Sequence, residues 1–143
     1  MNIKSLNDAI ALAIKAHSGQ VDKVGKPYIF HPMRVMQAMD TDVEQIVAVL
    51  HDVVEDSRLT VSELESMGYS KKIVRAIDCL SKREGEEYFN YIDRVKSSML
   101  ATKIKLADLN DNLDPNRIPV EPEEKKAERI IRYRKTIDLL TTS

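Results

Sequence analysis

The segment IVAVLHDVVEDS, residues 46–57, places one histidine and three carboxylates within six positions: His51, Asp52, Glu55 and Asp56. If the segment is helical, residues four apart share a face, so these side chains crowd onto about one turn. Carboxylates near a helix C-terminus oppose the macrodipole and repel one another. A solvated acidic helix end is one interpretation. The apolar residues around the cluster favour another, in which a divalent metal ion offsets the repulsion.

Two residues elsewhere could complete a metal site with His51 and Asp52. His31 stands at the expected start of a helix, and Asp108 lies among apolar residues of the segment 103–114. A capping or packing role is the alternative for His31, and an ion pair with a nearby lysine is the alternative for Asp108. Together the four residues offer two imidazole nitrogens and two carboxylate groups. That mixture suits Mn²⁺, Fe²⁺ or Zn²⁺ better than Ca²⁺ or Mg²⁺.

The elements that must position these residues are predicted to be helices. The chain has only four glycines and five prolines, and its apolar residues recur at a spacing near 3.6 almost throughout. We expect eight helices: four that begin near Ser5, His31, Asp40 and Thr60, and four over 70–81, 86–95, 97–113 and 123–141. The expected fold is all-α, with one domain over 1–143, a motif-bearing core of about 5–114 and a C-terminal helix over about 123–141.

Length and composition exclude several classes of protein. At 143 residues the chain is the size of one domain. Lys and Arg number 22 against 23 Asp and Glu, which argues against a general nucleic-acid binder. A single cysteine, Cys79, excludes an internal disulfide framework and a multi-cysteine zinc site. No apolar run is long enough to span a membrane or resembles a signal peptide, so we expect a cytoplasmic protein with no membrane partner.

Four stretches of the chain carry a family resemblance: AHSGQ (16–20), GKPYIFHP (25–32), VLHDVVEDS (49–57) and KLADLNDN (105–112). In this order they resemble the HD superfamily of metal-dependent phosphohydrolases. Within it, they are similar to the hydrolase domain of RelA/SpoT-homologue enzymes and to small stand-alone alarmone hydrolases. The resemblance covers residues 5–114 well and the C-terminal helix only loosely. It implies hydrolysis of a phosphoester in a small nucleotide, such as the 3′-pyrophosphate of (p)ppGpp.

The resemblance also implies a role for each matching residue. The family's metal ligands, for which Mn²⁺ is the usual ion, correspond to His31, His51, Asp52 and Asp108. The pair that orients and deprotonates the attacking water corresponds to Glu55 and Asp56. The substrate contacts correspond to Lys23, for a phosphate, and Asn112.

Two positions depart from the family pattern. Members that hydrolyse (p)ppGpp often have Arg-Lys where this chain has Asp22-Lys23, and an aromatic residue or histidine where it has Asp111. A carboxylate cannot stack on guanine as a guanidinium does, and it repels phosphate. One alternative is therefore a phosphohydrolase for another nucleotide, such as a nucleoside 5′-phosphate or a different pyrophosphorylated nucleotide. A second is a non-catalytic helical binding module that a metal stabilises, although such a module has no need of Glu55 and Asp56.

Two further parts of the sequence, His17 and the segment 123–141, indicate only general roles. His17, near the end of the first helix, is expected to be structural or to support the metal site from outside. The charged segment 123–141 is expected to present a solvated helical face. The alternative for that segment is a contact surface in a homo-oligomer.

Overall fold

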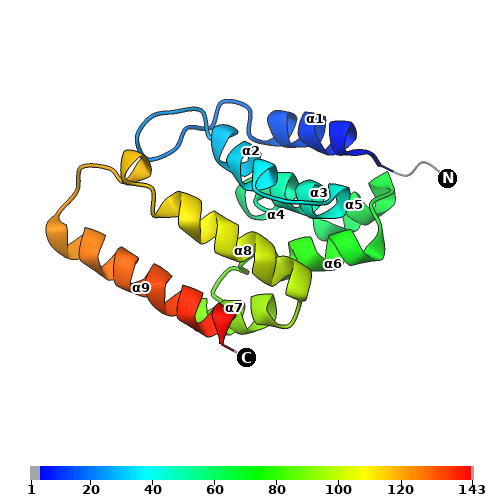
Figure 1. Ribbon diagram of the computed structural model, residues 1–143. Helices are drawn as coiled ribbons and strands as arrows, with labels where there is room; N and C mark the ends of the chain where they lie inside the picture. Colours follow the sequence, from blue (N-terminus) through cyan, green and yellow to red (C-terminus); the bar gives the residue numbers. More distant parts are fainter. Residues whose placement is uncertain (1–3, 143) are drawn as a thin grey trace.

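The computed structural model describes residues 4–142, and within that range it is all-helical, as the sequence predicts (Figure 1). The first helices in chain order are α1 (Leu6–Ala16), α2 (Phe30–Gln37), α3 (Asp42–Leu50), α4 (Val53–Asp56) and α5 (Val61–Met67). They are followed by α6 (Lys71–Leu80), α7 (Tyr88–Lys96), α8 (Met99–Asn112), the 3₁₀ turn η1 (Pro115–Arg117) and α9 (Glu123–Thr141).

Local sequence signals fix where several helices begin and end. Ser5, Thr41 and Thr60 each accept a hydrogen bond from the backbone N–H three residues ahead. The carboxylate of the acidic residue at that position accepts one in turn from the backbone N–H of the cap. These capping boxes satisfy backbone donors that a helix start leaves unpaired. Gly68 ends α5 at a φ of 110°, in the left-handed region that favours glycine. The predicted helix start near Thr60 is confirmed.

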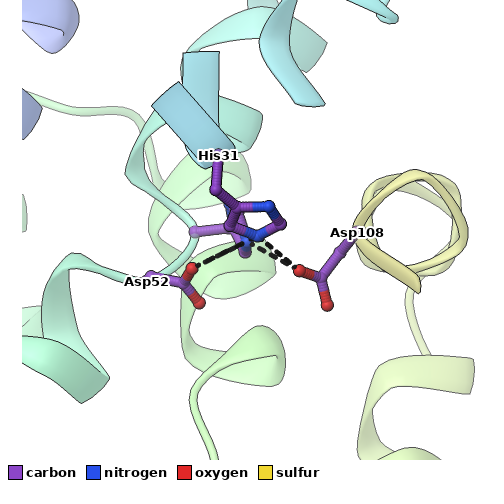
Figure 2. Close-up of side chains that lie close together, drawn as sticks. His31, Asp52 and Asp108 are labelled. Atoms are coloured by element: carbon purple, nitrogen blue, oxygen red, sulfur yellow. Dashed lines mark hydrogen bonds and ion pairs between the residues drawn. The ribbon is translucent and has the colours of Figure 1, made fainter. Parts of the chain in front are cut away.

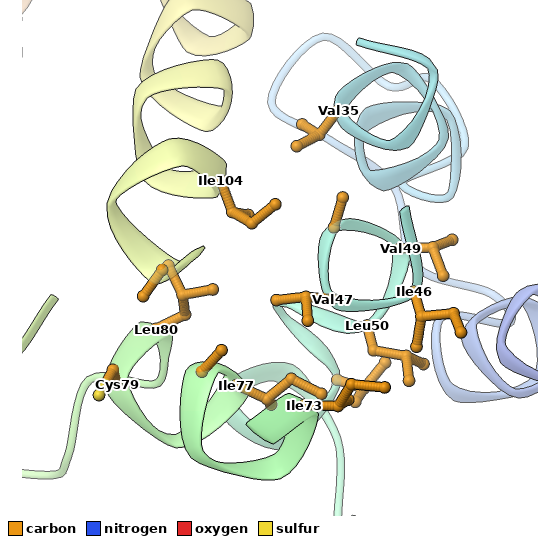
Figure 3. Close-up of a cluster of buried hydrophobic side chains, with 14 of the residues drawn as sticks. Val35, Ile46, Val47, Val49, Leu50, Ile73, Ile77, Cys79, Leu80 and Ile104 are labelled. Carbon is orange, nitrogen blue, oxygen red and sulfur yellow. The ribbon is translucent and has the colours of Figure 1, made fainter. Parts of the chain in front are cut away.

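Helix α3 occupies the centre of the hydrophobic core, and α1, α2, α6 and α8 pack around it (Figure 3). Val47, Val49 and Leu50 are fully buried there. Ile104 of α8 and Ile77 of α6 approach them from neighbouring helices. This packing holds the C-terminal end of α3, and therefore the residue that follows Leu50, in one place.

The predicted helix through residues 46–57 is two helices, which corrects the expectation that its polar residues share one continuous turn. Helix α3 stops at Leu50, and α4 begins at Val53. The break falls at His51 and Asp52, where the His51 Nδ1 atom lies 2.5 Å from the carbonyl oxygen of Ala48. The same carbonyl accepts a hydrogen bond from the backbone N–H of His51 at 3.4 Å, so His51 pairs it twice at the end of the helix.

The apolar spacing of residues 6–17 predicts that Ile14 shares the inward face of the first helix with Ile10 and Ala13, but Ile14 does not face the core. Its side chain is 52% exposed, whereas Ala9 and Ala13 of the same helix are fully buried. Helix α1 packs mainly on α3, so the two alanines face it and Ile14 turns toward solvent.

Helix α9 lies alongside α8 at the edge of the molecule (Figure 1). Its bounds match the predicted 123–141. Only Thr136 and Leu140 of this helix are buried, so it is held much less tightly than α3. Over residues 4–142, every helix is too short or too polar to cross a membrane.

Candidate metal centre and catalytic cavity

Four side chains that are distant in sequence meet at the break between α3 and α4. His31 reaches the site from α2, His51 and Asp52 come from the break itself, and Asp108 comes from α8 (Figure 2). One potential ligand atom from each lies within 4.8 Å of the others. The Nε2 atom of His31 is 2.8 Å from Asp108 Oδ1, and the Nε2 atom of His51 is 3.0 Å from Asp52 Oδ2. The structure therefore brings all four predicted ligands together, and we call this set the four-donor cluster.

The chemistry of the four-donor cluster fits a divalent transition metal. His31 and His51 are 2% exposed and Asp108 is 5% exposed, so these donors are shielded from bulk water. Burial raises the pKa of Asp52, but the neighbouring His51 outweighs it and lowers that pKa to about 2. Lys105 and the two histidines likewise hold the pKa of Asp108 well below its usual range against the effect of burial. Two ionised carboxylates beside two imidazoles form a His₂Asp₂ set, which suits Mn²⁺, Fe²⁺ or Zn²⁺.

Each donor of the cluster is anchored by a group outside it. His31 Nδ1 lies 2.6 Å from Asp111 Oδ2, and the Tyr28 hydroxyl donates to Asp52 Oδ2 at 2.6 Å. Lys105 Nζ donates to Asp108 Oδ2 at 2.9 Å, which leaves Asp108 Oδ1 facing the cluster. His51 is held by the carbonyl of Ala48, as described above. Such outer partners fix the orientation of metal-binding side chains.

Glu55 and Asp56 lie on α4, directly after the cluster, and both border the same cavity. Glu55 Oε1 accepts a hydrogen bond from the backbone N–H of Lys82 at 2.7 Å, which fixes one of its two oxygens. Burial and the charge of Asp52 raise the pKa of Glu55. Burial, followed by the charges of Asp52 and Glu55, raises the pKa of Asp56 to about 7. A carboxylate with such a pKa is suited to accept a proton near neutral pH.

The cavity has a volume of about 500 Å³, and most of its charged lining falls into two groups. The exceptions are Lys105, which pairs with Asp108, and Asp22, which lies beside Arg117. The acidic side consists of Asp52, Glu55, Asp56 and Asp108. The basic side consists of Lys23, Arg117 and Arg129, which come from the loop before α2, from η1 and from α9. Burial and then the charges of Arg129, Arg132 and Arg117 lower the pKa of Lys23, as expected where cations gather.

Asn112 and Lys23, the predicted substrate contacts, both line the cavity. The Asn112 Oδ1 atom accepts a hydrogen bond from Arg117 Nη1 at 2.6 Å. His17 is buried, lies outside the four-donor cluster and pairs with Gln20 through Nδ1 at 2.9 Å. Gln20 in turn donates to the backbone carbonyl of Asp56 at 2.9 Å, so the pair supports the end of α4.

Sequence reasoning missed several residues that line the cavity: Tyr28, Tyr91, Arg117, Arg129 and Tyr133. The four-residue spacing of Arg129 and Tyr133, which puts them on one face of the C-terminal helix, was the available signal. The segment 123–141 has a largely exposed face, as expected, but its Arg129 and Tyr133 line the cavity. The sequence alone does not reveal that this face lies against α8 rather than in water.

Asp22 is engaged with its own loop. Its Oδ1 atom accepts hydrogen bonds from the backbone N–H groups of Val24 and Lys26 at 3.0 and 2.9 Å. Its Oδ2 atom lies 3.9 Å from Arg117 Nε. The carboxylate that was expected to repel phosphate is therefore partly offset by a neighbouring guanidinium, and it shapes the loop that carries Lys23.

Comparison with curated proteins identifies a relationship over most of the chain. The bifunctional (p)ppGpp synthase/hydrolase SpoT of Escherichia coli (strain K12) is 31% identical over 126 residues, which cover 78% of this chain and 18% of that protein. The chain is a homologue of part of SpoT. A guanosine-3′,5′-bis(diphosphate) 3′-pyrophosphohydrolase of Aquifex aeolicus is 27% identical over 120 residues, covering 78% of this chain and 17% of that protein. The chain thus spans less than a fifth of the length of these curated relatives.

A solved structure shares the fold of this chain. It is that of a metazoan orthologue of SpoT, which is described as hydrolysing ppGpp and playing a role in starvation responses. The two structures superpose with a TM-score of 0.84 at 22% identity, over 99% of this chain and 89% of the other. No family model matches the chain. At this identity the structural likeness establishes the helical architecture.

Proposed function

We propose that the protein is a metal-dependent nucleotide phosphohydrolase that removes the 3′-pyrophosphate of (p)ppGpp-type nucleotides. The observation that carries this proposal is the position of the four-donor cluster, which borders the same cavity as Glu55 and Asp56. The names of the relatives support the substrate class, since one is a guanosine-3′,5′-bis(diphosphate) 3′-pyrophosphohydrolase. The basic side of the cavity supports an anionic ligand that carries several phosphate charges.

The proposed ligands of the metal are His31, His51, Asp52 and Asp108. We propose Mn²⁺ as the ion, with Fe²⁺ and Zn²⁺ as alternatives, because the set mixes imidazole nitrogen and carboxylate oxygen. When bound, such an ion supplies Lewis acidity, which lowers the pKa of water and polarises a phosphoryl oxygen.

Glu55 and Asp56 would orient the attacking water and take its proton. The backbone N–H of Lys82 holds one oxygen of Glu55, so the other oxygen is free to accept a hydrogen bond from the water. The water oxygen forms a bond to the phosphorus attached to the ribose 3′ oxygen, and the bond between that phosphorus and the 3′ oxygen breaks. The proton taken from water is finally delivered to the 3′ oxygen, so the products are pyrophosphate and a nucleotide with a free 3′-hydroxyl.

The basic side of the cavity would bind the phosphates. Lys23 stands in a loop shaped by Asp22, and Arg129 projects from α9 on the same face as Tyr133. Asn112 would position the substrate between this side and the four-donor cluster, because its Nδ2 atom lies 3.4 Å from Asp108 Oδ1. A cytoplasmic location and a homo-oligomeric state stay predictions.

A second candidate is the same chemistry on another nucleotide, and Asp22 is the observation that favours it. Its side chain lines the cavity, where a carboxylate offers no stacking surface to guanine. A nucleoside 5′-phosphate or a different pyrophosphorylated nucleotide would then be the substrate.

The test is a substrate panel with protein stripped of metal and reloaded with Mn²⁺. The panel contains ppGpp, pppGpp, the adenine counterpart of ppGpp, nucleoside 5′-phosphates and nucleoside triphosphates, with Asp52→Ala as the blank. We expect ppGpp and pppGpp to release pyrophosphate faster than the other compounds and the blank to be inactive. Turnover of another nucleotide with ppGpp inert would overturn the substrate proposal. A protein that binds Mn²⁺ and turns over nothing would overturn the proposal of an enzyme in favour of a binding module.

A further inference from the structure

Asp111 lies outside the four-donor cluster but touches one of its members. It follows Asp108 by three residues on α8, and its Oδ2 atom is 2.6 Å from the Nδ1 atom of His31. The other ring nitrogen of His31, Nε2, faces the cluster and lies 2.8 Å from Asp108. A ligand nitrogen must carry a lone pair, so a metal bound through Nε2 leaves the ring proton on Nδ1. Asp111 is placed to accept that proton in a hydrogen bond.

The carboxylate of Asp111 is itself held from two sides. Arg34 donates to both of its oxygens, from Nε to Oδ1 at 2.7 Å and from Nη2 to Oδ2 at 3.1 Å. Arg117 Nη1 lies 3.1 Å from Oδ2. The two-point contact with Arg34 is the fork geometry in which a guanidinium holds a carboxylate most firmly.

A third contact follows from this arrangement. Arg117 Nη1 lies 3.2 Å from His31 Nδ1. With the ring proton on Nδ1 both groups are donors, so they are close because each one points at Asp111 Oδ2. The Oδ2 atom of Asp111, on α8, is thus contacted both by His31 of α2 and by Arg117 of η1.

We infer that Asp111 is a positioning residue that fixes the ring of His31 for metal binding, with Arg34 and Arg117 holding its carboxylate in place. The inference rests on the proposed function, since it gives a role to a neighbour of that metal site. Outer carboxylates of this kind fix the tautomer and the orientation of a ligating imidazole, and they raise its basicity. The ring of His31 is 2% exposed, so in the intact protein Asp111, and not bulk water, is the acceptor beside Nδ1.

A purely structural ion pair would be the competing explanation, and metal affinity separates the two. The variants are Asp111→Ala, which removes the acceptor, and Asp111→Asn, which keeps an acceptor oxygen and nearly the same shape. Asp93→Asn is the matched control, because Asp93 is an exposed residue on α7. The dissociation constant for Mn²⁺ is measured by calorimetry on metal-stripped protein. The thermal unfolding midpoint is measured in chelator, so that folding is followed separately.

We expect Asp111→Ala to weaken Mn²⁺ binding by about 10- to 100-fold, the usual cost of losing an outer partner. Asp111→Asn should weaken Mn²⁺ binding less than Asp111→Ala does, and Asp93→Asn should bind Mn²⁺ as tightly as the wild type. If Asp111→Ala does not fold, a weaker affinity of the folded Asp111→Asn protein supports the inference, and an unchanged affinity overturns it.

Two other outcomes distinguish this inference from the proposed function. A wild-type protein that binds one Mn²⁺ per chain, beside an Asp111→Ala protein that is less stable but binds as tightly, would overturn the inference alone. A wild-type protein that binds neither Mn²⁺, Fe²⁺ nor Zn²⁺ would overturn both.

Discussion

The two sides of the cavity are built on different kinds of support. Three of the four acidic-side residues follow directly after α3, whose last five residues, 46–50, are all buried, and the fourth, Asp108, is a buried residue of α8. The basic side comes from a loop, a 3₁₀ turn and α9, and α9 buries only Thr136 and Leu140. Groups that act on a reacting bond need to be held within fractions of an ångström, whereas groups that bind phosphate by charge tolerate more movement. In the proposed enzyme, the chemical step would therefore take place beside the core, and phosphate would bind at the periphery.

The largest effect is expected from the acidic side, at Glu55. Glu55→Gln keeps the size of the side chain and its contact with the Lys82 N–H but removes the proton acceptor. The rate constant measured under single-turnover conditions should fall by about 10²- to 10⁴-fold, the usual contribution of a general base. The affinity for Mn²⁺ should remain, since Glu55 is outside the four-donor cluster. Glu65→Gln, at an exposed position on α5, is the control, and full turnover by Glu55→Gln would refute the assignment.

Substitutions in α3, which supports the acidic side, and in α9, which supports the basic side, should differ in their effect on the free energy of unfolding. Leu50 is fully buried beside the cluster, so Leu50→Ala should lower the free energy of unfolding by about 2–5 kcal/mol. Ile131 on α9 is 66% exposed, and Ile131→Ala should change the free energy of unfolding by no more than about 0.5 kcal/mol. Urea denaturation of both variants measures the difference. Equal losses would show that α9 is as firmly supported as α3.

The basic side should affect binding more than the chemical step. Arg129→Met keeps the apolar stem and removes the charge, so we expect kcat/KM to fall by about 10- to 100-fold, mostly through KM. Arg134→Met tests an exposed arginine of the same helix and should behave like the wild type. Steady-state kinetics on the substrate found by the panel measures both. An effect confined to kcat would mean that Arg129 belongs with the catalytic residues.

The smallest expected effect concerns the loop between α6 and α7, whose Lys82 holds Glu55. Arg94 pairs with both oxygens of Glu86 at 2.8 Å, and this contact, with the backbone N–H of Arg83, lowers the pKa of Glu86 from 4.5 to about 2. Since the pKa is lower in the folded state, the stabilisation is present above about pH 4.5 and is lost as the pH falls toward 2. Thermal unfolding of Glu86→Gln should therefore depend less on pH across that window. A pH dependence equal to that of the wild type would contradict the ion pair.

The sequence predicts the acidic side much better than the basic side, for physical reasons. His51 and Asp52 stand out because they follow a buried apolar run, where unpaired polar groups are costly. Arg129 and Tyr133 do not stand out, because α9 is polar on most of its surface and its packing against α8 depends on the whole fold. The break between α3 and α4 was missed for a related reason. At the break the His51 side chain contacts the backbone carbonyl of Ala48, and such a contact leaves no mark on the apolar spacing.

Asp111 illustrates what a departure from a family pattern can mean. From sequence it was only an unexpected carboxylate near the end of a helix. In the structure it accepts from His31 and from two arginines that lie 77 residues before it and 6 residues after it in sequence. Such convergence of distant segments is a property of the tertiary fold, and local sequence cannot show it.

The most direct test of the central claim joins metal occupancy to turnover in one experiment. Metal-stripped protein is titrated with Mn²⁺ while bound metal and pyrophosphate release from ppGpp are measured in the same samples. The account predicts that turnover rises in proportion to occupancy and levels off at one ion per chain, and that Asp52→Ala shows neither binding nor turnover. Turnover that is independent of occupancy, or equal in Asp52→Ala, would contradict a metal-dependent site built from His31, His51, Asp52 and Asp108.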